Sequence, residues 1–232
     1  MLEMLVLKMD RCLDNNEIWE LLRYVSPEKS EKIIRYYSNE DASRSLLGDL
    51  LIRFFISKKL SVRNEEIAFQ LNPYGKPFLI KPTTAIYFNL SHSDNWIVCA
   101  IDSNPIGVDV EKIKLIDLDV AKRFFTSEEY KTLYNQPKEF QLTYFYKLWT
   151  LKESYIKYIG EGMSIALDSF SVVINHAENI TVSRKNTMEP FVFHQSLLDA
   201  QSIFALCTLN KKKLKICYVS MKRLLDYYDK RF

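Results

Sequence analysis

The chain has 232 residues, of which 47% are hydrophobic and 26% are charged, with a formal net charge of +3. Five glycines and seven prolines are too few for a collagen-like or low-complexity chain, and the apolar content is too high for a disordered one. No run approaches the ~20 consecutive apolar residues of a membrane-spanning helix, and the start MLEMLVLKMD lacks the pattern of a secretory leader. We therefore expect a globular cytoplasmic protein that does not bind membranes.

The first predicted element of note is a long helix over residues 41–59, where leucine and phenylalanine recur at helical spacing. The tract NPYGKP (72–77) follows as a turn. Two short apolar runs, 85–90 and 96–101, are then predicted to be strands.

The segment FNLSHS (88–93) closes the first of these strands. Its asparagine, serine and histidine side chains can cradle a phosphate with hydroxyl, imidazole and backbone N–H donors. The commoner use of serine and asparagine is to cap a turn, and the sequence leaves both interpretations open.

The next strand candidate is PIGVDVEK (105–112), in which apolar and other residues alternate without a break. Asp109 and Glu111 therefore share one face, where two carboxylates repel each other unless a cation lies between them. Oxygen ligands of this type suit Mg²⁺. The alternative is an ordinary solvated strand face with Lys112 as the counter-charge.

Further along, FFTSEEY (124–130) is predicted to begin a helix, capped by Thr126 or Ser127. The glutamates then lie in the first turn, where the helix dipole favours them. Nothing local marks Glu129 as a base.

A second long helix is predicted over 139–159, with Gly160 placed to end it, followed by strands over 169–174 and 202–209. The order of a long helix and then strands thus occurs twice. It indicates a duplicated α+β unit with a boundary near residues 104–105.

Glu153 and Lys157 lie four apart in the second helix and so share one face. The simple interpretation is a surface ion pair. The functional one makes Glu153 a third metal ligand and Lys157 a partner of a phosphate.

The C-terminal tail is basic: residues 211–232 hold eight Lys or Arg against Asp226 and Asp229, a balance of +6. Such a tail can attract an acidic partner, but a solvated surface is the simpler interpretation. The rest of the chain carries −3, so no nucleic acid partner is expected. The four cysteines are scattered, and Cys99 and Cys207 lie in apolar runs, which predicts buried reduced thiols. Because cysteine and histidine ligands are so few, any bound metal is expected to be held by carboxylates.

In combination and order, these motifs resemble the Sfp (surfactin-synthetase-activating) type of 4′-phosphopantetheinyl transferase. The matching segments are SPEKSEK (26–32), RSLLGD (44–49), YGKP (74–77), FNLSHS (88–93), GVDVEK (107–112), AKRFFTSEEY (121–130) and WTLKESYIKYIGEGMS (149–164).

The resemblance implies an α+β fold of two pseudo-symmetric halves, each a small antiparallel sheet packed on a long helix, with coenzyme A in the cleft between them. We place the halves at 1–104 and 105–232, the second with the metal site and the basic tail 211–232. The implied activity is Mg²⁺-dependent transfer of phosphopantetheine from coenzyme A to a serine of an apo acyl or peptidyl carrier protein, of the holo-[acyl-carrier-protein] synthase type. A monomer is implied.

The resemblance also assigns roles to residues. The implied magnesium ligands are Asp109, Glu111 and Glu153. The implied catalytic residues are Glu129, as general base, and Lys157, beside the pyrophosphate. The residues implied to hold coenzyme A are Lys29, Lys32, Arg44, Gly75, Lys76, Pro77, Asn89, Leu90, Ser91 and His92. Residues 112–125 could be buried core or an exposed docking surface, and the resemblance favours docking of the carrier there and along the strands after Gly160.

Two other functions remain to be weighed. A Mg²⁺-dependent phosphodiesterase or nuclease would use the same carboxylates but leaves FNLSHS and YGKP without a role. A non-catalytic module that binds coenzyme A or a carrier protein would require neither Glu129 nor Lys157.

Overall fold

The computed structural model describes residues 2–175, 179–185 and 187–229. Its α-helices are α1 (Asn15–Leu21), α2 (Pro27–Ile34), α3 (Asn39–Leu60), α4 (Ala121–Phe124), α5 (Ser127–Tyr134), α6 (Lys138–Ile159) and α7 (Met221–Asp229). Its strands are β1 (Leu2–Lys8), β2 (Ala68–Leu71), β3 (Pro77–Lys81), β4 (Tyr87–Ser93), β5 (Trp96–Asp102), β6 (Ile106–Lys112), β7 (Phe170–Ile174), β8 (Ile180–Arg184), β9 (Thr187–Glu189), β10 (Val192–Asp199), β11 (Ser202–Thr208) and β12 (Lys215–Tyr218). Both predicted long helices are present, as α3 and α6.

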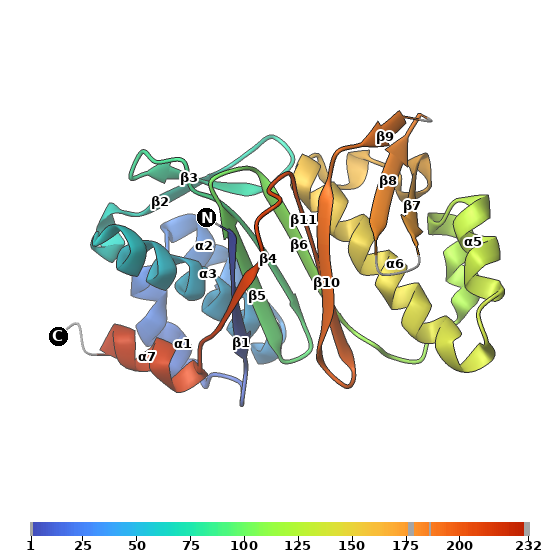
Figure 1. The fold of residues 1–232 in the computed structure, drawn as a ribbon. Coiled ribbons are helices and arrows are strands. Elements are labelled where there is room, and N and C mark those ends of the chain that lie inside the picture. Colours follow the sequence, from blue (N-terminus) through green and yellow to red (C-terminus); the bar gives the residue numbers. More distant parts are fainter. Residues whose placement is uncertain (1, 176–178, 186, 230–232) are drawn as a thin grey trace.

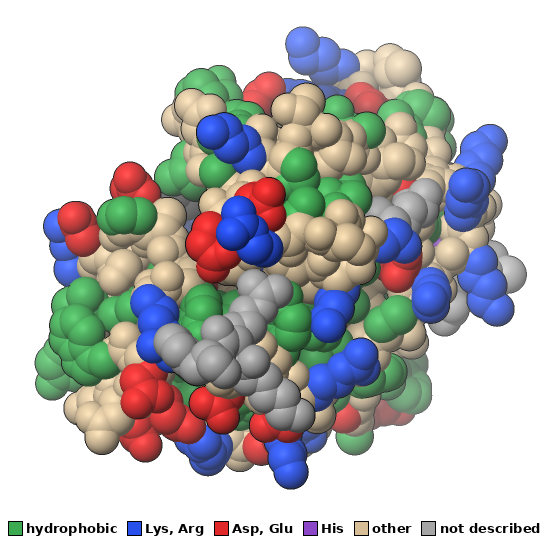
Figure 2. Space-filling view, turned by 90° about the vertical axis from the view of Figure 1, so that its left-hand side faces the viewer, with side chains coloured by type: hydrophobic (Ala, Val, Ile, Leu, Met, Phe, Trp, Pro, Cys, Tyr) green, Lys and Arg blue, Asp and Glu red, His purple; other side chains and the backbone are tan. Residues whose placement is uncertain are grey.

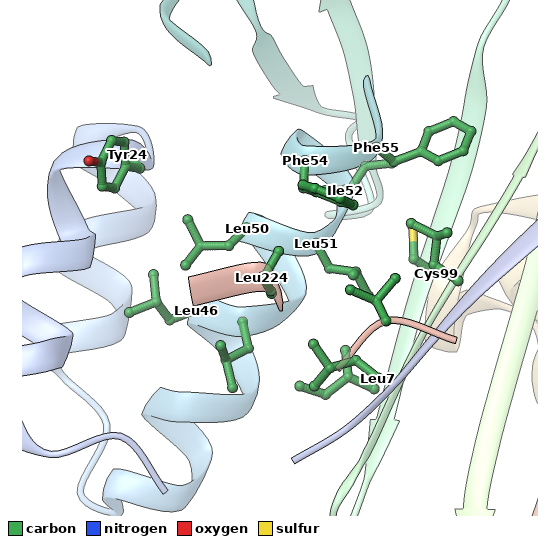
Figure 3. Close-up of a cluster of buried hydrophobic side chains, with 14 of the residues drawn as sticks. Leu7, Tyr24, Leu46, Leu50, Leu51, Ile52, Phe54, Phe55, Cys99 and Leu224 are labelled. Atoms are coloured by element: carbon green, nitrogen blue, oxygen red, sulfur yellow. The ribbon is translucent and has the colours of Figure 1, made fainter. Parts of the chain in front are cut away.

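The first half is built on α3, which packs against a sheet of order β12-β1-β5-β4. The helix is buried on nearly all sides because α1, α2 and α7 cover the faces that the sheet leaves free. Leu46, Leu50 and Leu51 are fully buried in this core; Leu46 and Leu50 point away from the sheet, and Leu51 lies on the side of Cys99 (Figure 3). Ser38 caps the helix by accepting the amide of Glu40.

The second half repeats this plan with α6 and a sheet of order β10-β11-β6. Gly160 ends α6 in the left-handed conformation, with φ 82°, as its position predicted. A separate sheet, β7-β8-β9, and helix α5 lie on the outer side of α6 (Figure 1).

A third apolar cluster joins the two main sheets, which lie next to each other between the helices (Figure 1). The strands of the first half contribute Met4 and Val98, and those of the second half contribute Val108, Val110 and Phe204. The α+β fold of two pseudo-symmetric halves, each with an antiparallel sheet on a long helix, is thus confirmed. One strand departs from it, since β12 pairs with β1 in parallel.

The C-terminal tail corrects the expected division of the chain. Residues 211–232 were placed with the second half, but β12 extends the sheet of the first half and α7 packs on α3. Tyr228 of α7 is 1% exposed, donates to the carbonyl of Leu50, and accepts at its own carbonyl from Tyr24. The apolar side chains of α7, such as Leu224, pack into the core of the first half. A count of basic residues does not detect this apolar pattern. Residues 230–232 lie outside the described part of the tail.

The charges of α7 belong to a mixed surface. On the face where α7 lies, groups of basic and acidic side chains are both present among hydrophobic and other polar areas (Figure 2). The prediction of buried thiols is confirmed for Cys99 and Cys207, whereas Cys12 is exposed. In the part of the chain that the structure describes, no helix is both long and apolar enough to cross a membrane.

Candidate active site

The site begins where α6 crosses β6 at Gly107. A Cβ at this position would collide with the carbonyl oxygen of Ser154 and the amide nitrogen of Tyr158, both in the backbone of α6. Only glycine therefore lets the helix lie this close to the strand. The close approach brings Glu153 and Lys157 of α6 to the face of β6 that carries the two carboxylates of the strand.

Asp109 lies at the centre of this acidic cluster and is 3% exposed. Its Oδ1 accepts from Ser91 Oγ at 2.9 Å and from Lys157 Nζ at 2.6 Å. Its Oδ2 is buried, and no group among the described residues donates to it. A buried carboxylate oxygen without a donor is costly, which makes Oδ2 a candidate ligand for a cation.

The pKa values of the neighbouring acids support this interpretation. Burial and the charge of Asp109 raise the pKa of Glu111 to about 7, against the hydrogen bond from Ser93 and the charge of Lys157. Burial, and then the charge of Asp109, raises the pKa of Glu153. The three carboxylates thus lie close enough to oppose one another's ionisation.

The three acids suit Mg²⁺ in their chemistry and burial. As they stand, no three His, Cys, Asp or Glu side chains in the described ranges converge closely enough to hold a metal ion. The ammonium of Lys157 lies instead against Asp109, where it supplies the positive charge.

Positive side chains gather beside this cluster. The pKa of His92 is lowered by loss of solvent and then by the charges of Arg44, Lys157 and Lys29. Burial also lowers the pKa of Lys29, which donates to Ser45 Oγ at 2.9 Å. These groups form a basic wall suited to phosphate. Lys32 is on α2 one turn from Lys29 and is exposed.

Arg44 is already paired within the protein. Its guanidinium contacts Glu40 at 2.6 Å and Asp41 at 2.7 Å, and also donates to the carbonyl of Asp94. It thereby ties the start of α3 to the turn between β4 and β5, and it presents its charge to His92 from a fixed position.

Lys76 differs most from the implied role in phosphate binding. Its ammonium donates to three backbone carbonyls of the second half, those of Ile106, Lys157 and Tyr158. Asn72 of the same turn donates to the carbonyl of Gly160 at 2.8 Å. The YGKP turn therefore ties the first half to the end of α6, and the Lys76 ammonium is not free for coenzyme A.

Several implied coenzyme A residues do surround one cavity of about 520 Å³ between the halves. The lining residues are Tyr74, Gly75, Lys76, Pro77, Asn89, Arg123, Phe124, Glu153, Ile156, Lys157, Gly160, Gly162, Ile165, Ala166, Leu167 and Asp168. Polar groups from both halves thus meet an apolar wall formed by α6 and the segment after it. Leu90 instead packs against the core of the first half, and Ser91 faces Asp109.

Glu129 lies outside the acidic cluster. It is 4% exposed, and its Oε2 accepts the amide of Thr126 at 2.8 Å in a capping box. Its Oε1 accepts the amide of Val172 at 2.7 Å and pairs with Lys152 Nζ at 2.8 Å. A general base needs hydrogen-bond reach to the proton that it takes. These contacts make Glu129 a structural anchor, and its role as general base stays a prediction.

Sequence analysis missed four residues that shape the site: Asn72, Ser93, Gly107 and Lys152. Each is in or beside a motif that was singled out, but its role depends on contacts across the fold. For Ser93 a signal was present, because it alternates with Ser91 and Asn89 along one face of a strand.

Comparison with known proteins shows the family of this chain. Residues 105–210 match the family profile described as "4'-phosphopantetheinyl transferase superfamily", and residues 14–104 match "4'-phosphopantetheinyl transferase, N-terminal". The chain is 42% identical over 199 residues to "4'-phosphopantetheinyl transferase Sfp" of Bacillus subtilis (strain 168), covering 86% of this chain and 88% of that one. It is also 42% identical over 195 residues to "4'-phosphopantetheinyl transferase gsp" of Aneurinibacillus migulanus, covering 84% and 81%.

A human relative, "L-aminoadipate-semialdehyde dehydrogenase-phosphopantetheinyl transferase", is 33% identical over 63% of this chain and 52% of its own. Among solved structures, the holo-[acyl-carrier-protein] synthase of Thermotoga maritima aligns with a TM-score of 0.38 and 19% identity, over 47% of this chain and 64% of that one. On the strength of the sequence relatives, the chain belongs to the 4′-phosphopantetheinyl transferase family, in its Sfp-type group.

Proposed function

We propose that this protein transfers the 4′-phosphopantetheine part of coenzyme A to a serine hydroxyl of an apo acyl or peptidyl carrier protein. The observation that carries the proposal is the meeting of the acidic cluster Asp109, Glu111 and Glu153 with the basic wall of Lys29 and His92. A diphosphate and a second phosphate need positive charge on several sides, which Lys29, Arg44 and Lys157 supply around His92, together with a cation on the acids. The names of the relatives point to the same reaction.

In this proposal Asp109, Glu111 and Glu153 hold Mg²⁺. The ion would supply Lewis-acid chemistry at the pyrophosphate. The unpartnered Oδ2 of Asp109 and the raised pKa values of the two glutamates support this donor set. Lys157, now on Asp109, is placed to move its charge to the phosphate that leaves.

The reaction joins the serine oxygen of the carrier to phosphorus and breaks the bond from that phosphorus to the departing adenosine 3′,5′-bisphosphate. The serine proton must go to a base. We assign this role to Glu153 in place of Glu129, because Glu153 lines the cavity whereas Glu129 is bound to Lys152 and to the amide of Val172. Such a transfer typically contributes about 10²–10⁴-fold in rate.

For coenzyme A, we assign phosphate contacts to Lys29, Lys32 and His92, supported by Arg44. Gly75, Pro77 and Asn89 would line the path of the ligand, since they border the cavity. Lys76 would contribute by holding the turn rather than through its charge.

The finer assignments complete the proposal: a holo-[acyl-carrier-protein] synthase type of activity, a cytoplasmic location, and a monomer that acts without membrane or nucleic acid. We keep the boundary at residues 104–105, where the two family profiles meet, and assign β12 and α7 to the first half.

The test is intact mass spectrometry of an apo carrier protein incubated with the enzyme, coenzyme A and Mg²⁺, beside an EDTA control. The expected result is a Mg²⁺-dependent gain of one phosphopantetheine that a Ser→Ala carrier does not show. Coenzyme A binding without any gain on several unrelated carriers would contradict transfer and favour a binding module. Release of nucleotide without modified carrier would favour a phosphodiesterase.

A further inference from the structure

Strands β4 and β6 lie next to each other across the boundary of the halves but belong to different sheets. β4 pairs with β5, and β6 pairs with β11. Side chains of β4 accept the amides of β6 in place of a backbone ladder. The three bonds are Val108 N to Asn89 Oδ1 at 2.8 Å, Val110 N to Ser91 Oγ at 3.3 Å, and Lys112 N to Ser93 Oγ at 3.1 Å.

The two serines make a second bond each, and these bonds reach the acidic cluster. Ser91 Oγ donates to Asp109 Oδ1 at 2.9 Å, and Ser93 Oγ donates to Glu111 Oε2 at 2.8 Å. Each hydroxyl thus binds a carboxylate and the backbone amide of the residue that follows it. The same two-bond clamp repeats two residues further along both strands, as strand periodicity requires.

The turn after β4 holds this arrangement in place. Asp94 pairs with Lys112 Nζ at 2.8 Å, and its carbonyl accepts from Arg44. These bonds anchor the residue that follows Ser93, whose hydroxyl contacts Glu111.

We propose that Ser91 and Ser93 are positioning residues that orient Asp109 and Glu111 toward a divalent cation. The inference rests on the proposed magnesium site and assigns the end of FNLSHS to the metal rather than to phosphate. Outer partners that hydrogen-bond a ligating carboxylate typically contribute 10–100-fold in metal affinity, and a loss of about this size is expected without the hydroxyl.

Ser93 gives the cleaner test, because Ser91 also contacts Lys157 Nζ at 2.9 Å. Threonine and valine have the same shape and differ by the hydroxyl, so Ser93→Thr and Ser93→Val form a matched pair. Ser196→Val, at an exposed position of β10, serves as the control. Each protein is saturated with coenzyme A and titrated with Mn²⁺, and the paramagnetic resonance signal of free Mn²⁺ reports binding, with coenzyme A alone as blank.

We expect Ser93→Thr and Ser196→Val to bind Mn²⁺ within about threefold of the unmodified protein, and Ser93→Val to bind it at least about tenfold more weakly. Equal affinities of the Thr and Val variants would overturn the positioning role. If Ser93→Val does not fold, Ser93→Ala takes its place under the same criterion, since alanine adds no bulk. Failure of the unmodified protein to bind Mn²⁺ would contradict the magnesium site itself, and failure to bind coenzyme A would contradict the proposed function.

Discussion

Helix α6 carries two lysines that each meet a buried acid, and the two pairs differ in how fully they are satisfied. Lys152 is fully buried, forms an ion pair with Glu129, and donates hydrogen bonds to the carbonyls of Leu167 and Phe170. Lys157 meets Asp109, whose second oxygen accepts no bond from a described residue. A buried ion pair whose hydrogen bonds are all made stabilises the fold, whereas a buried carboxylate that lacks a hydrogen-bond donor is a candidate ligand site.

The largest effect should come from breaking the saturated pair. Glu129→Ala leaves Lys152 buried without its counter-charge, which typically costs about 3–5 kcal/mol. The free energy of unfolding from urea denaturation measures this, with the exposed neighbour Glu128→Ala as control. A loss below about 1 kcal/mol together with a collapse of turnover would return Glu129 to the role of base.

Changing the unsatisfied pair should act on chemistry instead of stability. Asp109→Asn removes the central carboxylate of the acidic cluster, and turnover should fall more than about 100-fold, since even outer partners of a metal are worth 10–100-fold. The melting temperature should change little. Rates from the carrier mass assay, measured at several Mg²⁺ concentrations, test this; full activity at low Mg²⁺ would contradict it.

A third prediction concerns pH. Because the pKa of Glu111 is raised from 4.5 to about 7, the folded metal-free protein holds a proton that the unfolded chain has lost between these values. The stability of the metal-free protein should therefore decrease as pH rises through this window. Glu111→Gln removes that decrease and should stabilise the metal-free protein by about 1–2 kcal/mol at pH 8, after allowance for solvent screening.

Thermal unfolding in EDTA at pH 5 and pH 8 checks the sign. The difference between the Gln variant and the unmodified protein should be small at pH 5 and larger at pH 8. A stabilisation that does not change with pH would show that the pKa of Glu111 is not raised in the folded protein.

A fourth prediction concerns the link between the halves, where the effect on catalysis should be small. Lys76→Met leaves the carbonyls of Ile106, Lys157 and Tyr158 without their donor, at a cost of about 1–3 kcal/mol. The exposed Lys81→Met serves as the control. The KM for coenzyme A should rise only modestly, because the ammonium of Lys76 is already bound to these three carbonyls; a rise of more than about 100-fold would assign it to phosphate.

The sequence predicted the parts of this site whose signal is local. Strand alternation placed Asp109 and Glu111 on one face of β6, and helical spacing placed Glu153 and Lys157 on one face of α6, as the structure confirms. The contacts of Glu129 could not be predicted, because its partners Lys152 and Val172 are distant in the chain. The return of α7 to the first half was likewise missed, since a basic composition says nothing about where an apolar face packs.

The measurement that tests the account most directly places the two pairs in one assay. Glu129→Gln and Asp109→Asn are incubated with apo carrier, coenzyme A and Mg²⁺, and the mass gain of the carrier is followed over time per amount of folded enzyme. The account predicts that Glu129→Gln stays within about tenfold of the unmodified rate while Asp109→Asn loses more than about 100-fold. The reverse order, with Glu129→Gln inactive and Asp109→Asn active, would contradict it.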